Sequence, residues 1–572
     1  MTQPAHVFKP ANFQTRYNAR VPMRDGVELS ADVYLPQSAT KPVPAILVRT
    51  PYDNGDFAGL TNIVDRAVYF VQHGYAFVIQ DVRGRFDSHG EFYPWVNEYD
   101  DGYDTVEWVA MQDWCDGNVG MMGFSYVGGV QWQAAISGAP HLKCIAPGVI
   151  GDDHHGQTHY QGGAMQLGLD MTWTLLTDSR TFHRIDNHNW KQLLSYLPLA
   201  EMARAAGSSA PRLADWIDHP DYDDYWKLVA YKERYQDVKI PVMQIGGWYD
   251  TFSTGTMNNF AEMRKRGGSE LARKNQKVIM GPWIHRASEL THAGDQDFGK
   301  DSVLDLDAEH LRWFDRWLKD KHNGGDEESP IRLFVMGSNT WREEQEWPLA
   351  RTEFTPFFLR SKGRANSLRG DGELKMGGVP GNEPPDEYVY DPMFPVPTNG
   401  GNNCCFPEIV AWGGHDQTQV EQREDVLVYT SQPLAEDVEV TGPVVAKIYA
   451  SSSAPDTDFT AKLVDVHPDG YALNLCDGII RARYRETQER QVLMVPGSIY
   501  EFTVDLGPTS NVFKAGHRIR LEVSSSNFPR FDRNLNTGGR FGYETNIQVA
   551  RQKVYHDAER PSHVLLPVIP AG

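Results

Sequence analysis

The first 150 residues alternate short apolar, β-branched runs with stretches of helical spacing, and this alternation limits the folds open to the chain. Residues 104–114 have the spacing of an amphipathic helix between two such runs. Near-continuous apolar strands separated by helices predict a parallel sheet with both faces covered. The predicted strands are 43–50, 75–82, 119–125 and 142–150.

The alternation stops at about residue 151 and resumes at about residue 240. Between these points helical spacing dominates and no clear strand is found, which predicts a helical insertion. Strands are then expected over 240–250 and 276–285, followed by an amphipathic helix over 308–320. We therefore predict an α/β core interrupted by a helical cap, with core, cap and core over residues 1–150, 151–239 and 240–352.

From about residue 353 the pattern changes to the period-two alternation of half-buried strands, as in "DFTAKLVDVH" and "HRIRLEVSSS". Turn residues interrupt these runs at short intervals, which is typical of an antiparallel sandwich or jelly roll. The segment 364–403 is rich in Gly, Pro and Asn and predicts a long loop. We expect a C-terminal β jelly-roll domain over 353–572.

The net charge of −21 at pH 7 excludes classes of partner, because nucleic acids and anionic membranes repel an acidic surface. No window has the run of about 18 apolar residues that a spanning helix needs. The start, "MTQPAHVFKPANFQTRYNAR", lacks the basic and apolar segments of a signal peptide. We expect no nucleic-acid or membrane partner and a cytoplasmic location.

The chain has five cysteines, an odd and small number that suits a reducing compartment. None has C-x-x-C spacing, and neighbouring cysteines make poor joint metal ligands. All five are predicted to be buried or loop thiols. They are Cys115, Cys144, Cys404, Cys405 and Cys476.

The stretch "GFSYVGG" places Ser125 at a predicted strand-to-helix turn. It resembles the nucleophile elbow G-x-S-x-G, but Val127 stands where the second glycine belongs. Gly123 removes side-chain bulk before the serine, and the glycines at 128 and 129 relieve crowding after it. From this stretch alone, a nucleophile and an ordinary Gly/Ser turn remain equally open.

A serine nucleophile needs a base, and the base needs a group that fixes its tautomer. In α/β-hydrolases these follow the serine in the order acid, then histidine, at the ends of later strands. Asp250 ends the predicted strand "PVMQIGGWYD", and His285 ends "KVIMGPWIH". Each residue has an ordinary alternative, but three strands ending in Ser, Asp and His in this order predict a catalytic triad.

The stretch "GDDHHGQTH" is a candidate metal site, because His155 and His159 would share a face if it were helical. The stretch follows a strand and lacks the H-E-x-x-H arrangement, so we predict a polar loop over the site. The segment "DVRGRFDSHGEF" has no phosphate-loop spacing and is interpreted as a structured loop. No metal and no organic cofactor are expected.

Preorganised donors must meet the developing oxyanion. The backbone N–H of Tyr126 is the expected first donor because it directly follows the serine. Tyr52, in "RTPYDNG" after an early strand, offers a hydroxyl as the second donor. Its alternative role is that of a packed turn residue beside Pro51.

The motifs "RTPYDNG", "VIQDVRGRFDSHGEF", "CDGNVGMMGFSYVGGVQWQAA", "IGGWYDTF", "GPWIH" and "KAGHRIRLEVSSSNFPRFDRNLNTG" together resemble those of the CocE/NonD hydrolases. The resemblance spans nearly the whole chain. In that family the elbow is G-x-S-Y-x-G, as Tyr126 and Gly128 stand here. It implies an α/β-hydrolase core with a helical cap and a C-terminal jelly roll, and a dimer or larger homo-oligomer.

The resemblance implies that Ser125 is the nucleophile, Asp250 the orienting acid and His285 the general base. It makes Tyr52 and the Tyr126 amide the oxyanion donors. Phe252 and Trp173 are implied as apolar walls of the acyl pocket, although either aromatic residue could equally belong to a packed core.

Within this family we expect a carboxylesterase for an uncharged or aromatic acyl group. Relatives that take α-amino substrates carry a carboxylate close behind the nucleophile, where this chain has Gly128 and Gly129. Asp53, Asp152 or Asp153 could replace it from loops. An amide hydrolase of the β-lactam acylase, α-amino acid ester hydrolase or X-Pro dipeptidyl-peptidase type is the alternative. An inert binding protein is the alternative from another class.

Overall fold

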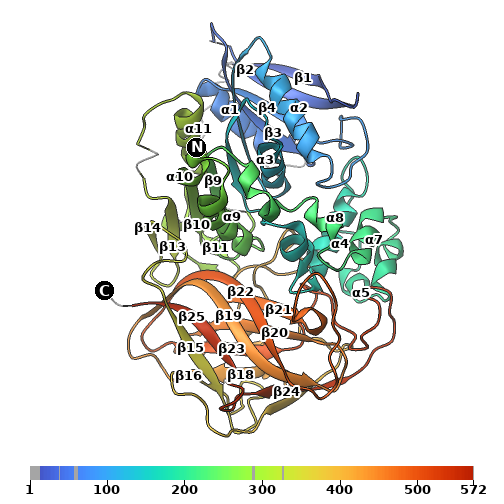
Figure 1. Cartoon of the computed structure of the whole chain (residues 1–572), viewed down its shortest axis with the longest axis vertical. Helices are drawn as coiled ribbons and strands as arrows, with labels where there is room; N and C mark the ends of the chain where they lie inside the picture. The colour runs from blue at the N-terminus through green and yellow to red at the C-terminus, as the bar shows by residue number, and fades with distance from the viewer. Residues whose placement is uncertain (1–12, 38, 57–61, 287–289, 325–327, 571–572) are drawn as a thin grey trace, which may run out of the picture.

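The structure is a computed structural model that describes residues 13–37, 39–56, 62–286, 290–324 and 328–570. An α/β region, a cluster of helices beside it and a large β domain below it are visible in Figure 1. Residues 1–12, which carry most of the stretch inspected for a signal peptide, lie outside the described residues. Within the described ranges, no helix is long and apolar enough to cross a membrane.

A ten-stranded sheet forms the centre of the α/β region among the described residues. Its central strands run parallel, and the predicted strands are all found. In spatial order they are β4 (Ala76–Asp81), β3 (Val43–Thr50), β5 (Cys115–Phe124), β6 (Leu142–Gly148), β9 (Val242–Gly247), β10 (Gln276–Gly281) and β13 (Ile331–Val335). Antiparallel strands complete the two edges: β1 (Phe13–Pro22), β2 (Glu28–Pro36) and β14 (Thr340–Glu344).

Helices cover both faces of this sheet, as the apolar strands predict. One face packs against α1 (Ile63–Gln72) and α11 (Leu306–Leu318). The other packs against α2 (Glu98–Ala110), α3 (Tyr126–Ser137) and α9 (Ser253–Arg266). The short helix α10 (Glu270–Lys274) follows α9, and a small hairpin of β11 (His292–Ala293) and β12 (Gln296–Asp297) lies between β10 and α11.

The predicted helix 104–114 is displaced, because α2 begins at Glu98 and ends at Ala110. Its first turn carries three acidic side chains, which interact favourably with the positive end of the helix dipole. Because these side chains are charged, the apolar pattern begins only after the first turn and does not mark the start of the helix. Gly102 lies within it, where an added Cβ would be 3.0 Å from the Cβ of Ala134 on α3. Glycine at this position therefore permits close packing of the two helices.

The chain between β6 and β9 forms a helical region with its own apolar core. Its helices are α4 (Leu167–Thr177), α5 (Trp190–Leu194), α6 (Met202–Ala205), α7 (Pro211–Asp218) and α8 (Asp224–Lys227). A hairpin of β7 (Tyr160–Gln161) and β8 (Ala164–Met165) precedes them.

The polar loop predicted over "GDDHHGQTH" is instead a π-helical turn, His154–His159. Its histidines are buried against aromatic residues of the helical region, such as Trp216 and Trp226. A polar sequence resembles a loop, and only the distant aromatic partners make its burial possible.

The C-terminal domain is a β jelly roll whose strands pair almost entirely in antiparallel fashion. Two of its strands lie inside 364–403, so the prediction of a long loop there is wrong. One of them, Asp386–Tyr390, pairs with Ala550–Tyr555, a partner that no local pattern reveals. The strands are β15 (Glu353–Arg360), β16 (Glu373–Met376), β17 (Asp386–Tyr390), β18 (Leu427–Thr430), β19 (Val438–Ser452), β20 (Asp458–Val466), β21 (Ala472–Arg481), β22 (Tyr500–Phe513), β23 (Arg518–Ser524), β24 (Ala550–Tyr555) and β25 (His563–Ile569).

The α/β region and the jelly roll share one apolar core. Trp248 and Tyr249, just after β9, belong to the same buried cluster as Leu463 and Phe513 of the jelly roll. The loop that follows β9 is therefore packed from below by the C-terminal domain (Figure 1).

Candidate active site

Ser125 occupies the sharp turn between β5 and α3, with φ 61° and ψ −127°. A non-glycine residue in such a conformation costs about 1–3 kcal/mol and persists only where its surroundings hold it. Its N–H donates to the Gly148 carbonyl at 2.9 Å, and its carbonyl accepts from the N–H groups of Gly128 and Gly129 at 2.8 and 3.0 Å. The strained turn at the strand-to-helix junction matches the predicted nucleophile elbow.

The glycines of this elbow lie where other atoms approach the backbone closely. A Cβ on Gly123 would collide with the Val127 side chain, so bulk at 127 requires glycine at 123. A Cβ on Gly128 would lie 2.8 Å from the Gly148 carbonyl oxygen, and one on Gly129 would lie 2.5 Å from the Trp95 ring. The prediction that the two later glycines relieve the crowding is confirmed.

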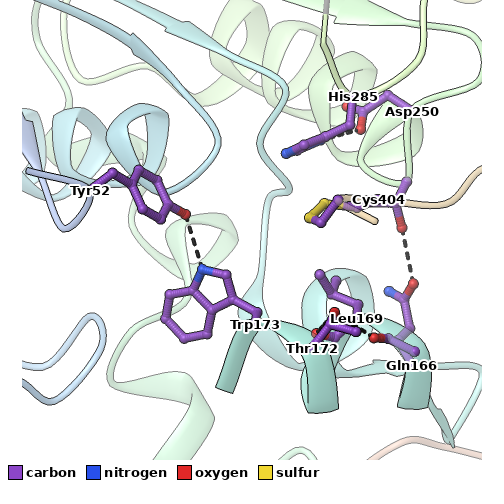
Figure 2. The surroundings of a disulfide bond; sticks show 11 residues. Tyr52, Gln166, Leu169, Thr172, Trp173, Asp250, His285 and Cys404 are labelled. Atoms are coloured by element: carbon purple, nitrogen blue, oxygen red, sulfur yellow. Dashed lines mark hydrogen bonds and ion pairs between the residues drawn. A yellow bond between two sulfur atoms is a disulfide. The ribbon is translucent and has the colours of Figure 1, made fainter. Parts of the chain in front are cut away.

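Asp250 and His285 form a buried pair in which Asp250 Oδ1 lies 2.7 Å from His285 Nδ1. They lie on loops beyond the strands, because β9 ends at Gly247 and β10 at Gly281, so the prediction that they end the strands is slightly wrong. Proton donation from Nδ1 to the carboxylate makes Nε2 the basic nitrogen. This nitrogen points away from Asp250 (Figure 2).

Tyr52 lies on the loop after β3 with its hydroxyl in the site. The hydroxyl accepts a hydrogen bond from Trp173 Nε1 at 3.0 Å (Figure 2), and it interacts with the Ser125 hydroxyl. Burial raises the pKa of this phenol above its usual value, so the proton stays in place for donation. Asp81 supports the loop by accepting from the Asn54 N–H at 2.8 Å.

Tyr126 is anchored beneath the elbow by its own side chain. Its hydroxyl donates to Glu98 at 2.8 Å, and Glu98 forms an ion pair with Arg49 at 2.7 Å. Its ring stacks on Trp95 with centroids 3.9 Å apart. The backbone N–H that follows Ser125 is thus held by a buried, hydrogen-bonded aromatic residue.

The predicted residues meet at one cavity with about 450 Å³ of empty space, part of it open to solvent. It is lined by Tyr52, Ser125, Tyr126, Trp173 and Phe252. His285 adjoins it, because its ring centroid lies 5.5 Å from that of Phe252.

Two residues of this cavity with ionisable side chains, His159 and Asp170, were not predicted as site residues. His159 Nδ1 lies 2.7 Å from Asp170 Oδ1, and both side chains are buried. Burial raises the pKa of Asp170 well above its ordinary range and lowers that of His159 to about 3, so both favour their uncharged forms. Asp170 gave no sequence signal, because it lies on a helix with no motif around it.

The acidic residues considered as replacements bind other groups. Asp153 forms an ion pair with Lys232 at 2.5 Å, and Asp152 accepts from Asn258 at 3.0 Å. Asp53 accepts from the Gly55 N–H at 3.0 Å in its own turn. His155 and His159 do not form a shared metal-binding face, because His155 is hydrogen-bonded to the Pro220 carbonyl at 2.9 Å.

Cys404 and Cys405, from a loop of the jelly roll, also line the cavity and are joined by a disulfide. The prediction of five thiols is therefore wrong for this pair, whereas Cys115, Cys144 and Cys476 are buried thiols. Cys405 has a φ of 91°, so the backbone turns here and the two side chains can meet. Figure 2 shows Cys404 beside His285.

Comparison with known proteins gives consistent matches. The X-Pro dipeptidyl-peptidase (S15 family) profile matches residues 25–287, and that of the X-Pro dipeptidyl-peptidase C-terminal non-catalytic domain matches 323–565. The chain is 41% identical to the cocaine esterase of Rhodococcus sp. (strain MB1 Bresler), over 98% of this chain and 99% of that protein.

Two solved structures share the fold along the whole chain. An α-amino acid ester hydrolase superposes with a TM-score of 0.85 at 27% identity, covering 99% of both chains. An aminopeptidase from a marine sediment archaeon (Thaumarchaeota archaeon) superposes with a TM-score of 0.85 at 24% identity, covering 100% of this chain and 99% of that one.

Proposed function

The chain belongs to the X-Pro dipeptidyl-peptidase (S15) family, in its CocE/NonD group, and is a serine hydrolase of carboxylic esters; from this premise we propose the residues that carry the reaction. Ser125 is the nucleophile, His285 the general base and Asp250 the acid that orients it. One observation supports this assignment above all. Asp250 Oδ1 lies 2.7 Å from His285 Nδ1, and this pair lies beside the cavity that Ser125 lines.

The reaction proceeds by acyl transfer in two halves. His285 Nε2 takes the proton of Ser125 as the serine oxygen attacks the ester carbonyl carbon. The Tyr52 hydroxyl and the Tyr126 N–H stabilise the tetrahedral oxyanion. His285 then gives its proton to the leaving alkoxide as the C–O bond breaks, and an acyl-enzyme and a free alcohol result.

Water completes the cycle. His285 removes a proton from a water molecule as its oxygen attacks the acyl-enzyme, and the second tetrahedral intermediate forms at the same donors. Collapse of this intermediate releases the carboxylic acid and returns the proton to Ser125. The chemistry uses only side chains and backbone groups of this chain.

The acyl group is uncharged and preferably aromatic. The walls that Trp173 and Phe252 give the cavity support this choice, because flat aromatic groups stack well on such side chains. Asp170, the carboxyl group in the cavity, favours its neutral form and is a weak partner for an ammonium group. The relative named cocaine esterase supports an ester substrate.

Amide hydrolysis is the second candidate. It is favoured by the match to an X-Pro dipeptidyl-peptidase profile. The leaving group of an amide is poorer, and the same triad would have to protonate it before the C–N bond breaks.

A panel of p-nitrophenyl esters and amino-acyl p-nitroanilides, run on the wild type and on Ser125→Ala, tests the proposal. We expect ester turnover with a preference for aromatic acyl groups and its loss in the variant. Activity that survives in Ser125→Ala would contradict the nucleophile assignment. Faster turnover of free-amine anilides than of esters would favour the amide hydrolase.

Assembly and location remain expectations of the same kind. A homodimer or larger homo-oligomer is supported by the resemblance to the CocE/NonD hydrolases. A cytoplasmic site of action is supported by the small number of cysteines, whereas the Cys404–Cys405 disulfide is uncommon in a reducing compartment. Light scattering on the purified protein measures the first, and cell fractionation the second.

A further inference from the structure

We propose that Cys404, Cys405 and His285 form a binding site for a soft divalent metal ion, such as Zn²⁺ or Cd²⁺, when the cysteines are reduced. Occupation of this site would stop ester hydrolysis. The metal site itself stands on geometry alone, and only its inhibitory effect rests on the proposed role of His285.

The donor atoms are already gathered. The two sulfur atoms and a ring nitrogen of His285 all lie within 4.8 Å of one another. Thiolate and imidazole are the ligands that Zn²⁺ and Cd²⁺ favour, and three protein ligands with one open position are a common zinc arrangement. A small closing movement would bring all three donors onto one ion.

His285 is oriented as metal-binding histidines usually are. Its Nδ1 is bound to the Asp250 carboxylate at 2.7 Å, which leaves Nε2 as the ligand atom. A carboxylate on the second ring nitrogen fixes the tautomer and strengthens the imidazole as a ligand. The arrangement that suits a general base therefore also suits a metal ligand.

The backbone explains why adjacent cysteines can act together here. In an extended strand, neighbouring side chains point to opposite sides, and the pair would be a poor joint ligand. Cys405 instead has a φ of 91°, and both sulfurs meet on the cavity side of the loop. Asn402 ties this loop to the catalytic one by donating to the Trp248 carbonyl at 2.6 Å.

Reduction controls the site, because a disulfide offers no thiolate. An external dithiol or phosphine breaks the Cys404–Cys405 bond and yields two thiols, and the reductant is oxidised by two electrons. Metal binding then releases the thiol protons. With Nε2 on the metal, His285 cannot take the Ser125 proton.

The test uses the full chain, reduced with a phosphine that is then removed, and titrated with Cd²⁺. Ester turnover and the ultraviolet thiolate-to-cadmium absorption are recorded together. We expect both to change with one equivalent of Cd²⁺ and to be reversed by EDTA. The oxidised protein should show neither change, and an equal response in both redox states would overturn the proposal.

Variants separate the metal site from the catalytic assignment. In the double variant Cys404→Ser/Cys405→Ser, Cd²⁺ should no longer inhibit the ester turnover that this variant shows. Cys115 is a buried thiol elsewhere in the chain, so Cys115→Ser should respond to Cd²⁺ as the wild type does. Persistent inhibition in the double variant would refute the site.

Two further variants complete the design. Ser125→Ala should lose turnover yet keep the absorption band, so failure of the catalytic proposal would not be mistaken for failure of the metal site. Asp250→Asn should weaken Cd²⁺ binding by about 10- to 100-fold, because it removes the group that orients His285. Unchanged affinity in this variant would show that His285 is not a ligand.

Discussion

Tyr126 shows why a tyrosine follows the nucleophile in this chain. Its backbone N–H is the proposed first oxyanion donor, while its side chain enters a buried network with Glu98 and Arg49. Both charged partners are almost wholly buried, so each polar atom there depends on a hydrogen bond. The side chain fixes the structure, and the backbone serves the chemistry.

Tyr126→Phe should therefore reduce stability and leave catalysis nearly unchanged. Removing the hydroxyl takes a hydrogen bond from Glu98 and should lower the free energy of unfolding by about 1–3 kcal/mol. Urea denaturation measures this loss, with Tyr17→Phe, 69% exposed, as the control. A fall in kcat of more than about tenfold, with stability unchanged, would contradict the division of labour between side chain and backbone.

Tyr52→Phe should show the opposite pattern. The hydroxyl is the proposed second donor to the transition-state oxyanion, so its loss should lower kcat by about 10²–10³-fold with little change in KM. Steady-state kinetics on one aromatic ester checks this, and an unchanged melting temperature shows that the turn remains folded. A kcat within a factor of about three of wild type would show that the second donor is another group.

At the scale of elements, β17 carries an unexpected buried cluster in the jelly roll. Asp386 accepts hydrogen bonds from Ser361 at 2.8 Å and from Tyr429 at 2.7 Å, and it lies 2.9 Å from His556 Nε2. The residue types resemble a second triad, but the side chains of Asp386 and His556 are fully buried. The cluster joins β17 to its neighbours and has no route to a substrate.

His556 should make stability depend on pH in a defined direction. Burial lowers its pKa, but the hydrogen bond to Asp386 and the charges of Asp386 and Glu383 outweigh burial and raise it above 6.5. A raised folded pKa means that its contribution is full below about pH 6.5 and is lost as the pH rises through the folded pKa.

The difference in unfolding free energy between wild type and His556→Gln should thus be largest near pH 6 and become smaller at higher pH. Each unit by which folding raises the pKa of His556 corresponds to about 1.4 kcal/mol of this difference. Denaturant titrations across this range measure it. His183→Gln, at an exposed position, is the control for the replacement of a histidine by glutamine. A difference for His556→Gln that does not vary with pH would contradict the assignment.

At the scale of the whole molecule, the jelly roll contributes to the cavity of the candidate active site. It supplies Cys404 and Cys405 to the cavity, and Asn402 donates to the carbonyls of Trp248 and Asp250, at 2.6 and 3.2 Å. The shared apolar core beneath this loop extends the same contact. The position of Asp250 therefore depends on a domain that contributes no triad residue.

Asn402→Ala should lower kcat by about 10- to 100-fold, because small displacements of catalytic groups have effects of this size. Asn399→Ala is the matched control, since Asn399 donates to the Asp416 carbonyl at 2.8 Å within the jelly roll. Kinetics of both variants at equal folded fraction provide the comparison. Equal activity of the two variants would show that the loop needs no support from Asn402.

The sequence by itself determined the parallel strands, the strained serine turn and the order of Ser125, Asp250 and His285 along the chain. These features depend on local periodicity and on turn chemistry, which short windows of sequence contain. Gly123 was interpretable for the same reason, since a Cβ there would collide with Val127, four residues away. Gly128 and Gly129 instead leave room for Gly148 and Trp95, which are distant in the sequence.

Only the tertiary structure decided what surrounds the triad. The His159–Asp170 pair, the meeting of Cys404 with His285, and the pairing of β17 with β24 all join segments that no single window of sequence contains. Such contacts form because apolar surfaces of distant segments are buried together, and burial then changes the charge state and the partners of polar groups. The chemistry was therefore predictable from local sequence, whereas the shape and polarity of the cavity required the fold.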